Sequence, residues 1–301
     1  MGVGRAARWR AVAVTALVAT PFVVGTASAD EPPAGEVAFR VSDHRIVESS
    51  GLTWVDVDGE RWIVTVNDSG DSGQVFTLDP ATGETVGVTT FEPNPRDVEA
   101  LAPAGEGDVW VADIGDNRRA RASVTLTRVS VGPRDMAADD PETRTLRYPD
   151  RARDAETLLA HPRTGRLYVV TKGALGGRVM EVPEVDAADP ETMRDLGQVP
   201  AIITDGAFLP SGDHVLLRNY TRGYLLTFPE WEVVEQFELP RQPQGEGLTV
   251  LPEGDVLLST EGRERDVLRV ELPGTVGPAV DALRSWWQGV WTRWSAGLTA
   301  P

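Results

Sequence analysis

The sequence predicts an all-β fold, a β-propeller of five four-stranded blades. Residues 36–272 consist of short runs rich in Val, Leu, Thr and aromatic residues, and Gly, Pro, Asp and Asn separate these runs. The region contains no long apolar stretch with the 3.6-residue period of a helix. A unit of several such runs recurs five times, and about 47 residues per unit is close to the ~40–50 residues of a propeller blade.

Each unit begins with an apolar run that follows or includes an acidic or polar residue. These first runs start 49, 57, 49 and 41 residues apart, at residues 50–53, 99–102, 156–159, 205–208 and 246–249. The second runs are residues 62–66, 109–112, 167–170, 214–217 and 256–259. The third runs are residues 74–78, 123–129, 178–182, 224–228 and 267–272. A fourth run closes the first four units, at residues 85–91, 143–148, 194–199 and 232–239.

The fifth unit has no fourth run, and residues 36–41 can supply it from the other end of the region. A last blade that is completed from both ends closes the ring, which protects the edges that an open sheet would expose. Two other arrangements stay open at this point. One is a β-sandwich, and the other is a six-bladed ring with one degenerate unit.

The N-terminal segment has the composition of a targeting sequence. Arg5, Arg8 and Arg10 lie before or at the start of an apolar stretch, residues 11–24, and Ala27-Ser28-Ala29 forms an A-x-A cleavage site. Residues 1–29 are therefore predicted to be a signal peptide, and the mature chain is expected to be secreted or held in the extracytoplasmic cell envelope. The alternative is an uncleaved N-terminal anchor, although this apolar stretch is short for a membrane span.

The C-terminal segment also differs from the repeat. Residues 273–280 begin with a Pro/Gly-rich stretch and are predicted to be a linker, and residues 281–301 are predicted to be a Trp-rich amphipathic helical tail. Its apolar residues, Leu283, Trp287, Val290, Trp291 and Trp294, have helical spacing. Such a helix packs on the main domain, or it contacts a partner or a membrane interface, which Trp favours. Two basic residues in the tail are weak support for membrane contact.

Composition excludes several classes of protein. The 301 residues include 46 acidic and 29 basic residues, for a net charge of -17, and no Cys. The absence of Cys excludes disulfide scaffolds, thiolate zinc sites and Cys nucleophiles, and the acidic balance argues against nucleic-acid binding. The G-x-S-x-G, H-E-x-x-H and phosphate-loop motifs are also missing. We expect a monomer that binds a small-molecule or cell-envelope ligand.

The repeat brings polar residues together at one face of the predicted propeller. Antiparallel pairing places the start of the first strand beside the end of the second, and the first strand of a blade is innermost. These positions are expected to surround the mouth of the central channel. The predicted ligand-binding residues are Asn67, Asp97, Asp154, Asp205, Asn219, Glu246 and Glu261, and the candidate catalytic residues are Glu99, Glu156 and Lys172. Crowded carboxylates raise pKa values and recruit cations.

Two loops at this mouth share a D-x-G-D pattern. Asp68 and Asp71 lie in the first loop, and Asp113 and Asp116, followed by Asn117, lie in the second. Oxygen ligands on such loops suit Ca²⁺, which takes six to eight oxygens in flexible geometry. These five residues are therefore the predicted metal ligands. The alternative is that Asp, Gly and Asn only form the turns, with their side chains accepting backbone N–H groups.

Several motifs resemble those of a known family. They are RDVEAL at residues 96–101, ADIGDN at 112–117, YPD at 148–150, DAE at 154–156 and VVTK at 169–172. Over residues 40–272 the chain is similar to secreted bacterial β-propellers related to esterase-like, phytase-type proteins. β-Propeller phytases bind phosphate through calcium ions at an acidic channel mouth. The resemblance therefore implies that Asp113, Asp116, Glu99 and Glu156 bind metal.

Two functional hypotheses follow from these observations. The first is a secreted binding or scaffold protein with a carboxylate-rich, calcium-binding channel mouth. The second is a metal-dependent phosphoesterase or esterase, in which a metal polarises the substrate and Lys172 is a cationic partner. A third possibility is that the mouth residues form only structural salt bridges, with Arg96, Arg118, Arg153 and Arg218 as the cations.

Overall fold

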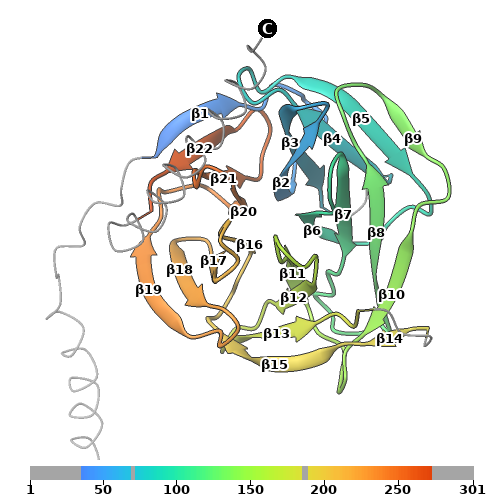
Figure 1. The fold of residues 1–301 in the computed structure, drawn as a ribbon, viewed down its shortest axis with the longest axis vertical. Helices are drawn as coiled ribbons and strands as arrows, with labels where there is room; N and C mark the ends of the chain where they lie inside the picture. Colours follow the sequence, from blue (N-terminus) through green and yellow to red (C-terminus); the bar gives the residue numbers. More distant parts are fainter. Residues whose placement is uncertain (1–34, 69–71, 185–188, 273–301) are drawn as a thin grey trace, which may run out of the picture. The chain divides into compact units, whose positions relative to one another are not determined.

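The computed structural model describes residues 35–68, 72–184 and 189–272, and in these residues the fold is a five-bladed β-propeller (Figure 1). Every regular element among them is a strand, and none is a helix that could cross a membrane. The predicted all-β, five-bladed fold is thereby confirmed. Four predictions lie outside the described residues, namely the signal peptide predicted at 1–29, the ligand predicted at Asp71, the linker predicted at 273–280 and the helical tail predicted at 281–301.

The strands of each blade follow one another from the centre outward. Blade 1 contains β2 (Ser49–Val57), β3 (Glu60–Asn67), β4 (Gln74–Leu78) and β5 (Thr85–Phe91). Blade 2 contains β6 (Val98–Pro103), β7 (Asp108–Asp113), β8 (Val124–Ser130) and β10 (Thr143–Arg147). Blade 3 contains β11 (Ala155–Ala160), β12 (Leu167–Thr171), β13 (Gly177–Glu181) and β15 (Arg194–Val199). Blade 4 contains β16 (Asp205–Phe208), β17 (His214–Arg218), β18 (Arg222–Thr227) and β19 (Val233–Glu238).

Blade 5 is closed by the N-terminal strand, as the repeat predicts. It contains β20 (Gly245–Val250), β21 (Val256–Thr260), β22 (Asp266–Val270) and β1 (Glu36–Arg40). β1 pairs antiparallel with β22, with Glu36 opposite Arg269 and Arg40 opposite Asp266. The Arg40 guanidinium also forms an ion pair with Asp266 across this ladder, at 2.8 Å. β22 is therefore paired on both sides, and β1 forms the outer edge of blade 5.

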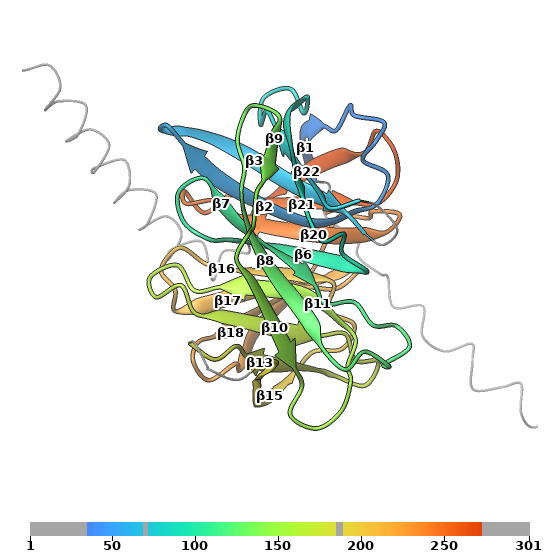
Figure 2. The ribbon, with the colours of Figure 1, turned by 90° about the vertical axis from the view of Figure 1, so that its right-hand side faces the viewer.

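Two short parallel strands tie neighbouring blades together at their outer edges, and the sequence did not predict them. β9 (Met136–Ala138) leaves the connection between β8 and β10 and pairs with β5 of blade 1. β14 (Glu191–Thr192) leaves the connection between β13 and β15 and pairs with β10 of blade 2. Figure 2 looks onto the side where β8, β9 and β10 lie. Strands of two or three residues are too short to carry an alternating pattern.

The hydrophobic core is divided among the five interfaces between neighbouring blades. Between blades 2 and 3, for example, Ala100 and Leu126 belong to the same cluster as Leu158 and Val169. The other four clusters occupy the remaining interfaces. Burial of a Val or Leu side chain stabilises a fold by roughly 1.5–3 kcal/mol. The blades thus stabilise one another, and the polar ends of the inner strands are left at the channel.

Candidate functional site

The pairing of the two inner strands places the residues predicted to surround the channel mouth. The residue opposite the start of each first strand is the end of the second strand. The pairs are Ser49 with Asn67, Val98 with Asp113, Ala155 with Thr171, Asp205 with Arg218 and Gly245 with Thr260. The same two strand ends therefore meet in all five blades, and the mouth residues come from equivalent places in the repeat.

A β-bulge interrupts the innermost strand in four blades. The residues left unpaired include Ser50, Glu99, Glu156 and Glu246, each next to the start of its strand. Gly206 occupies the equivalent place in blade 4, where the pairing is regular. A bulge re-aims a side chain out of the regular alternation of the strand. The three Glu side chains are buried, and the charges of Glu156 and Glu246 both raise the pKa of Glu99.

Among the described residues, three carboxylates from blades 1 and 2 form a close acidic group. One oxygen atom from each of Asp68, Asp97 and Glu99 lies within 4.8 Å of the others. Asp68 follows β3, Asp97 precedes β6, and Glu99 is the bulge residue of β6. The Ser50 hydroxyl donates to Oε2 of Glu99 at 3.2 Å. These oxygens could hold a hard cation such as Ca²⁺.

A glycine makes room for this acidic group. A Cβ atom on Gly115 would lie 2.5 Å from Oδ2 of Asp97 and 2.5 Å from Oε1 of Glu99. The Gly115 N–H also donates to the Asp97 carbonyl at 3.1 Å, which holds the two loops together. The glycine of the second D-x-G-D loop therefore permits the close approach of two carboxylates to the backbone. Glycine is used in this way where a backbone and another group must come close.

Burial and mutual repulsion change the acidity of the mouth residues. Burial, together with the charges of Asp68 and Glu156, raises the pKa of Glu99 to about 10. Burial and the neighbouring Asp68 raise the pKa of Asp97 to about 6. Burial and Glu246 raise the pKa of Glu261 to about 7. Near neutral pH these carboxylates need either protons or a cation nearby to relieve their repulsion.

A second polar group lies in blades 3 and 4. The Lys172 ammonium donates to Oε1 of Glu156, and it donates to the Tyr220 hydroxyl at 2.9 Å. It also lies 5.3 Å from the centre of the Tyr220 ring, within cation–π range. Oε2 of Glu156 is buried and has no hydrogen-bond partner among the described residues. Burial raises the pKa of Glu156 to about 8, even though Lys172 acts in the opposite direction.

The residues of the second D-x-G-D loop make contacts within the protein. Asp113 accepts the backbone N–H of Arg96 at 3.2 Å and of Asp97 at 3.0 Å, and Arg121 donates to it at 2.6 Å. Asp116 accepts the N–H of Arg121 at 2.8 Å, and its own N–H donates to Asp154 at 2.9 Å. The predicted ligand Asn117 is exposed. Asp113, Asp116 and Asp154 thus hold the loop backbone in place.

Three further predicted ligands also fix the backbone. Asn67 accepts the N–H groups of Val47 and Glu48, at 3.0 and 3.1 Å. Asp205 is fully buried and accepts the N–H of Leu248 in blade 5 at 2.6 Å. Burial raises the pKa of Asp205 well above its usual range, although the hydrogen bonds from the backbone N–H groups of Leu248 and Gly206 lower it. The Asn219 side chain accepts two N–H groups of its own turn, those of Thr221 and Arg222.

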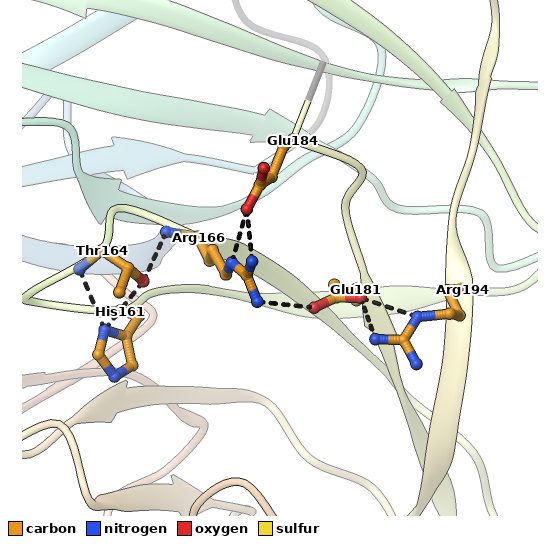
Figure 3. Close-up of polar contacts among 6 residues, drawn as sticks. All are labelled: His161, Thr164, Arg166, Glu181, Glu184 and Arg194. Atoms are coloured by element: carbon orange, nitrogen blue, oxygen red, sulfur yellow. Dashed lines mark hydrogen bonds and ion pairs between the residues drawn. The ribbon is translucent and has the colours of Figure 1, made fainter. Parts of the chain in front are cut away.

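The far end of blade 3 holds His161, whose contacts are those of a structural residue. Its Nδ1 lies 3.1 Å from the Thr164 hydroxyl, and burial holds its pKa below the usual value (Figure 3). His161 follows the last residue of β11, whereas Glu156 is near the first. His161 therefore lies at the other end of β11 from the channel mouth. The residues predicted from the sequence to lie at the mouth did not include Tyr220 and Arg121, because neither belongs to a recurring motif.

Comparison with known proteins assigns no family. No protein-family model matches the chain, and no curated protein matches it. Among solved structures, the chain is similar to a glucose dehydrogenase, with a TM-score of 0.48 and 12% identity over 80% of this chain and 100% of that one. It is also similar to a candidate 6-phosphogluconolactonase from Bacteroides uniformis, with a TM-score of 0.40 and 14% identity over 75% of this chain and 68% of that one. The relation to phytase-type proteins stays a prediction.

Proposed function

We propose that the protein is an extracytoplasmic binding protein whose channel mouth binds Ca²⁺ through Asp68, Asp97 and Glu99. The observation that carries this proposal is the approach of three carboxylate oxygens within 4.8 Å of one another. Glu99 is buried and the two Asp residues are half-buried. Carboxylates at such distances repel each other, and a divalent cation bound between them offsets this repulsion because it attracts each carboxylate. Oxygen donors favour Ca²⁺ over the softer transition metals.

A second observation supports a cation beside Glu99. Oε2 of Glu156 is buried and lacks a hydrogen-bond partner among the described residues, and Glu156 acts electrostatically on Glu99. A buried carboxylate oxygen without a donor is costly. A cation in the mouth would reduce this cost directly or through a bound water. A small-molecule or cell-envelope ligand would supply further oxygens, since Ca²⁺ takes six to eight.

A metal-dependent phosphoesterase or esterase is the alternative function. It is favoured by the group of Glu156, Lys172 and Tyr220, which combines a carboxyl group of pKa about 8 with a cation and a hydroxyl. A group that titrates near neutral pH can transfer a proton during hydrolysis. A metal at the neighbouring acidic group would polarise the phosphoryl or carbonyl oxygen. In that case Glu156 and Lys172 would contact the substrate.

The calcium proposal is tested by calorimetric titration of chelator-treated protein with Ca²⁺ at pH 8. We expect Glu99→Gln and Asp68→Asn each to weaken binding by about tenfold or more, because each removes one charged ligand. Glu106→Gln is the matched control, since Glu106 is an exposed acid in the turn that leaves β6. Its affinity should equal that of the unmodified chain. Absence of binding to the unmodified chain would refute the proposal.

The hydrolase alternative is tested with p-nitrophenyl phosphate and p-nitrophenyl acetate in the presence of Ca²⁺. A hydrolase should lose turnover by roughly 100-fold or more in Lys172→Gln, as expected for removal of an acid–base partner. A binding protein should show background turnover that neither Lys172→Gln nor Glu99→Gln changes. The two functions therefore differ in whether these substitutions change the turnover of the ester substrates. Calcium binding does not distinguish them, because both functions include it.

A further inference from the structure

A cavity of about 240 Å³ lies beside the channel mouth, between blade 2 and the segment that connects it to blade 1. Its apolar wall comes from the end of β5 and from the connecting segment. Its hydroxyl-bearing wall comes from the residue before β8, from β8 and from β10. The residues concerned are Phe91, Pro93 and Pro95 on the first wall, and Ser123, Thr125 and Thr143 on the second. Apolar walls with a few converging polar groups are typical of small-molecule sites.

Arg121 supplies a buried donor in the lining of this cavity. Its side chain is 8% exposed, and Nη1 donates to Oδ1 of Asp113 at 2.6 Å and to the Gly115 carbonyl at 2.9 Å. Its Nε is buried and has no hydrogen-bond partner among the described residues. A buried guanidinium N–H group normally donates a hydrogen bond, because burying the donor without an acceptor costs free energy. Because Nε is enclosed by protein atoms, Arg121 contributes to the cavity the positive charge of its guanidinium and not this N–H group.

The side chains that line the cavity have a net positive charge, whereas the chain as a whole is acidic. Arg96 and Arg121 both line it, and Asp113 is the one acid in the lining. Asp113 is paired with Arg121, and the exposed Arg96 guanidinium makes no ion pair with any described residue. The cavity thus carries one net positive charge, although the whole chain has a net charge of -17. Local charge of this sign selects anions over neutral molecules and cations.

We propose that this cavity binds a small organic carboxylate, whose anionic group meets the positive charges of Arg96 and Arg121 in the lining. A guanidinium matches the planar shape of a carboxylate, and the proline and phenylalanine wall suits an apolar or aromatic body. The volume equals that of roughly eight water molecules, which leaves room for a ligand of about ten non-hydrogen atoms. The site uses none of the proposed calcium ligands, so it stands independently of the proposed function.

The test is a calorimetric comparison of 4-hydroxybenzoate with its neutral analogue 4-hydroxybenzamide at pH 7.5. The two have the same number of non-hydrogen atoms, and they differ in the charge of the group that would meet the arginines. We expect 4-hydroxybenzoate to bind with a dissociation constant on the order of 1 mM or below. The amide should bind about tenfold or more weakly, since hydrogen bonds to a charged group are lost.

Substitutions locate the binding to this cavity. Arg96→Gln removes an exposed charge that has no ion-pair partner among the residues that the structure describes, and Ser123→Leu occupies part of the cavity. Each should weaken 4-hydroxybenzoate binding by about tenfold while the melting temperature stays close to that of the unmodified chain. Arg134→Gln, an exposed arginine outside the cavity, is the control and should leave binding unchanged.

Three results would overturn the proposal. One is the absence of 4-hydroxybenzoate binding to the unmodified chain, and the second is equal binding of the acid and the amide. The third is binding that Arg96→Gln and Ser123→Leu leave unchanged, which would locate the ligand elsewhere. Binding of inorganic phosphate without binding of 4-hydroxybenzoate counts with the first result, because it would assign the cavity to another class of anion.

Discussion

Glu99, Glu156 and Glu246 occupy equivalent positions in three blades, the bulge of the innermost strand. The bulge leaves these residues out of the ladder, so they carry charge without removing an apolar side chain from the interfaces between blades. Their burial is what makes the charges costly, and it explains the raised pKa of Glu99 and Glu156. Under the proposed function, protons and the bound cation therefore compete for these carboxylates.

This competition predicts a pH dependence of stability. The pKa values of Asp97, Glu99 and Glu156 rise on folding to about 6, 10 and 8, so above about pH 5 the folded chain binds more protons than the unfolded chain. Without a cation, the free energy of unfolding should fall as the pH rises from 5 to 8, by at least ~1 kcal/mol. Urea denaturation at several pH values measures this change.

Saturating Ca²⁺ should flatten that profile, since the cation replaces the protons. Calcium should also bind more tightly at pH 8 than at pH 6, because carboxylates bind metal in their deprotonated form. Glu99→Gln removes one of the titrating groups and should give a shallower profile without Ca²⁺. A free energy of unfolding that rises with pH between 5 and 8 would contradict the raised pKa values.

Gly115→Ala tests the close approach at the acidic group. The added Cβ would meet oxygens of Asp97 and Glu99 at 2.5 Å, so one carboxylate must move. We expect a loss of stability of about 1–3 kcal/mol and weaker Ca²⁺ binding. Gly132→Ala is the control, because a Cβ there meets Val57 only at 3.8 Å or more. Equal effects of the two substitutions, on denaturation and on calcium titration, would argue against this role of Gly115.

At the scale of elements, the regular part of the fold could be predicted and the irregular part could not. Alternating runs predicted β4, β5, β15 and β16 with the bounds that the structure has. β9 and β14 were missed, because two or three residues give no period and their pairing depends on the neighbouring blade. The bulges were not predicted either. A bulge adds one extra residue to one strand of a pair, and no particular residue type marks it in the sequence.

The interblade strand β14 is held by a buried ion pair. Glu191 accepts two hydrogen bonds from Arg144 of blade 2, at 3.0 and 2.6 Å, and both side chains are largely buried. Glu191→Gln should lower the free energy of unfolding by roughly 3–5 kcal/mol, because Arg144 is left buried without its partner. Thermal or urea denaturation gives the value.

The exposed pair of Glu184 and Arg166 provides the comparison (Figure 3). These side chains are 75% and 49% exposed, so Glu184→Gln should cost about 1 kcal/mol or less. If Glu191→Gln costs no more than Glu184→Gln, then β14 does not stabilise the contact between blades 2 and 3 in the way described.

At the scale of the whole molecule, the ring of blades decides which residues can meet. The repeat predicted that Asp68, Asp97 and Glu99 lie at one mouth, although they belong to different units. It could not predict which acids come together in the acidic group and which accept backbone N–H groups, as Asp113 and Asp205 do. That division depends on the direction of single side chains. Tyr220 and Arg121 act at positions that only the packing of neighbouring segments defines.

Closure of the ring by β1 can be tested with Phe39→Ala. Phe39 is buried in the interface between blades 5 and 1, and it lies on the strand that completes blade 5. The substitution should cost roughly 3–5 kcal/mol by the loss of buried area and the cavity left behind. Val37→Ala on the same strand is the control, since Val37 is 52% exposed and should cost within about 0.5 kcal/mol. Similar denaturation midpoints for both variants would contradict a closing role for β1.

The most direct test of the account is the anomalous scattering of crystals soaked with a lanthanide ion as a substitute for Ca²⁺. The proposal predicts a peak at roughly 2.3–2.6 Å from carboxylate oxygens of Asp68, Asp97 and Glu99. It further predicts the loss of that peak in Glu99→Gln crystals, with the fold unchanged. A map with no peak at these three residues, or with peaks only at exposed acids elsewhere on the surface, would contradict a cation site at the channel mouth.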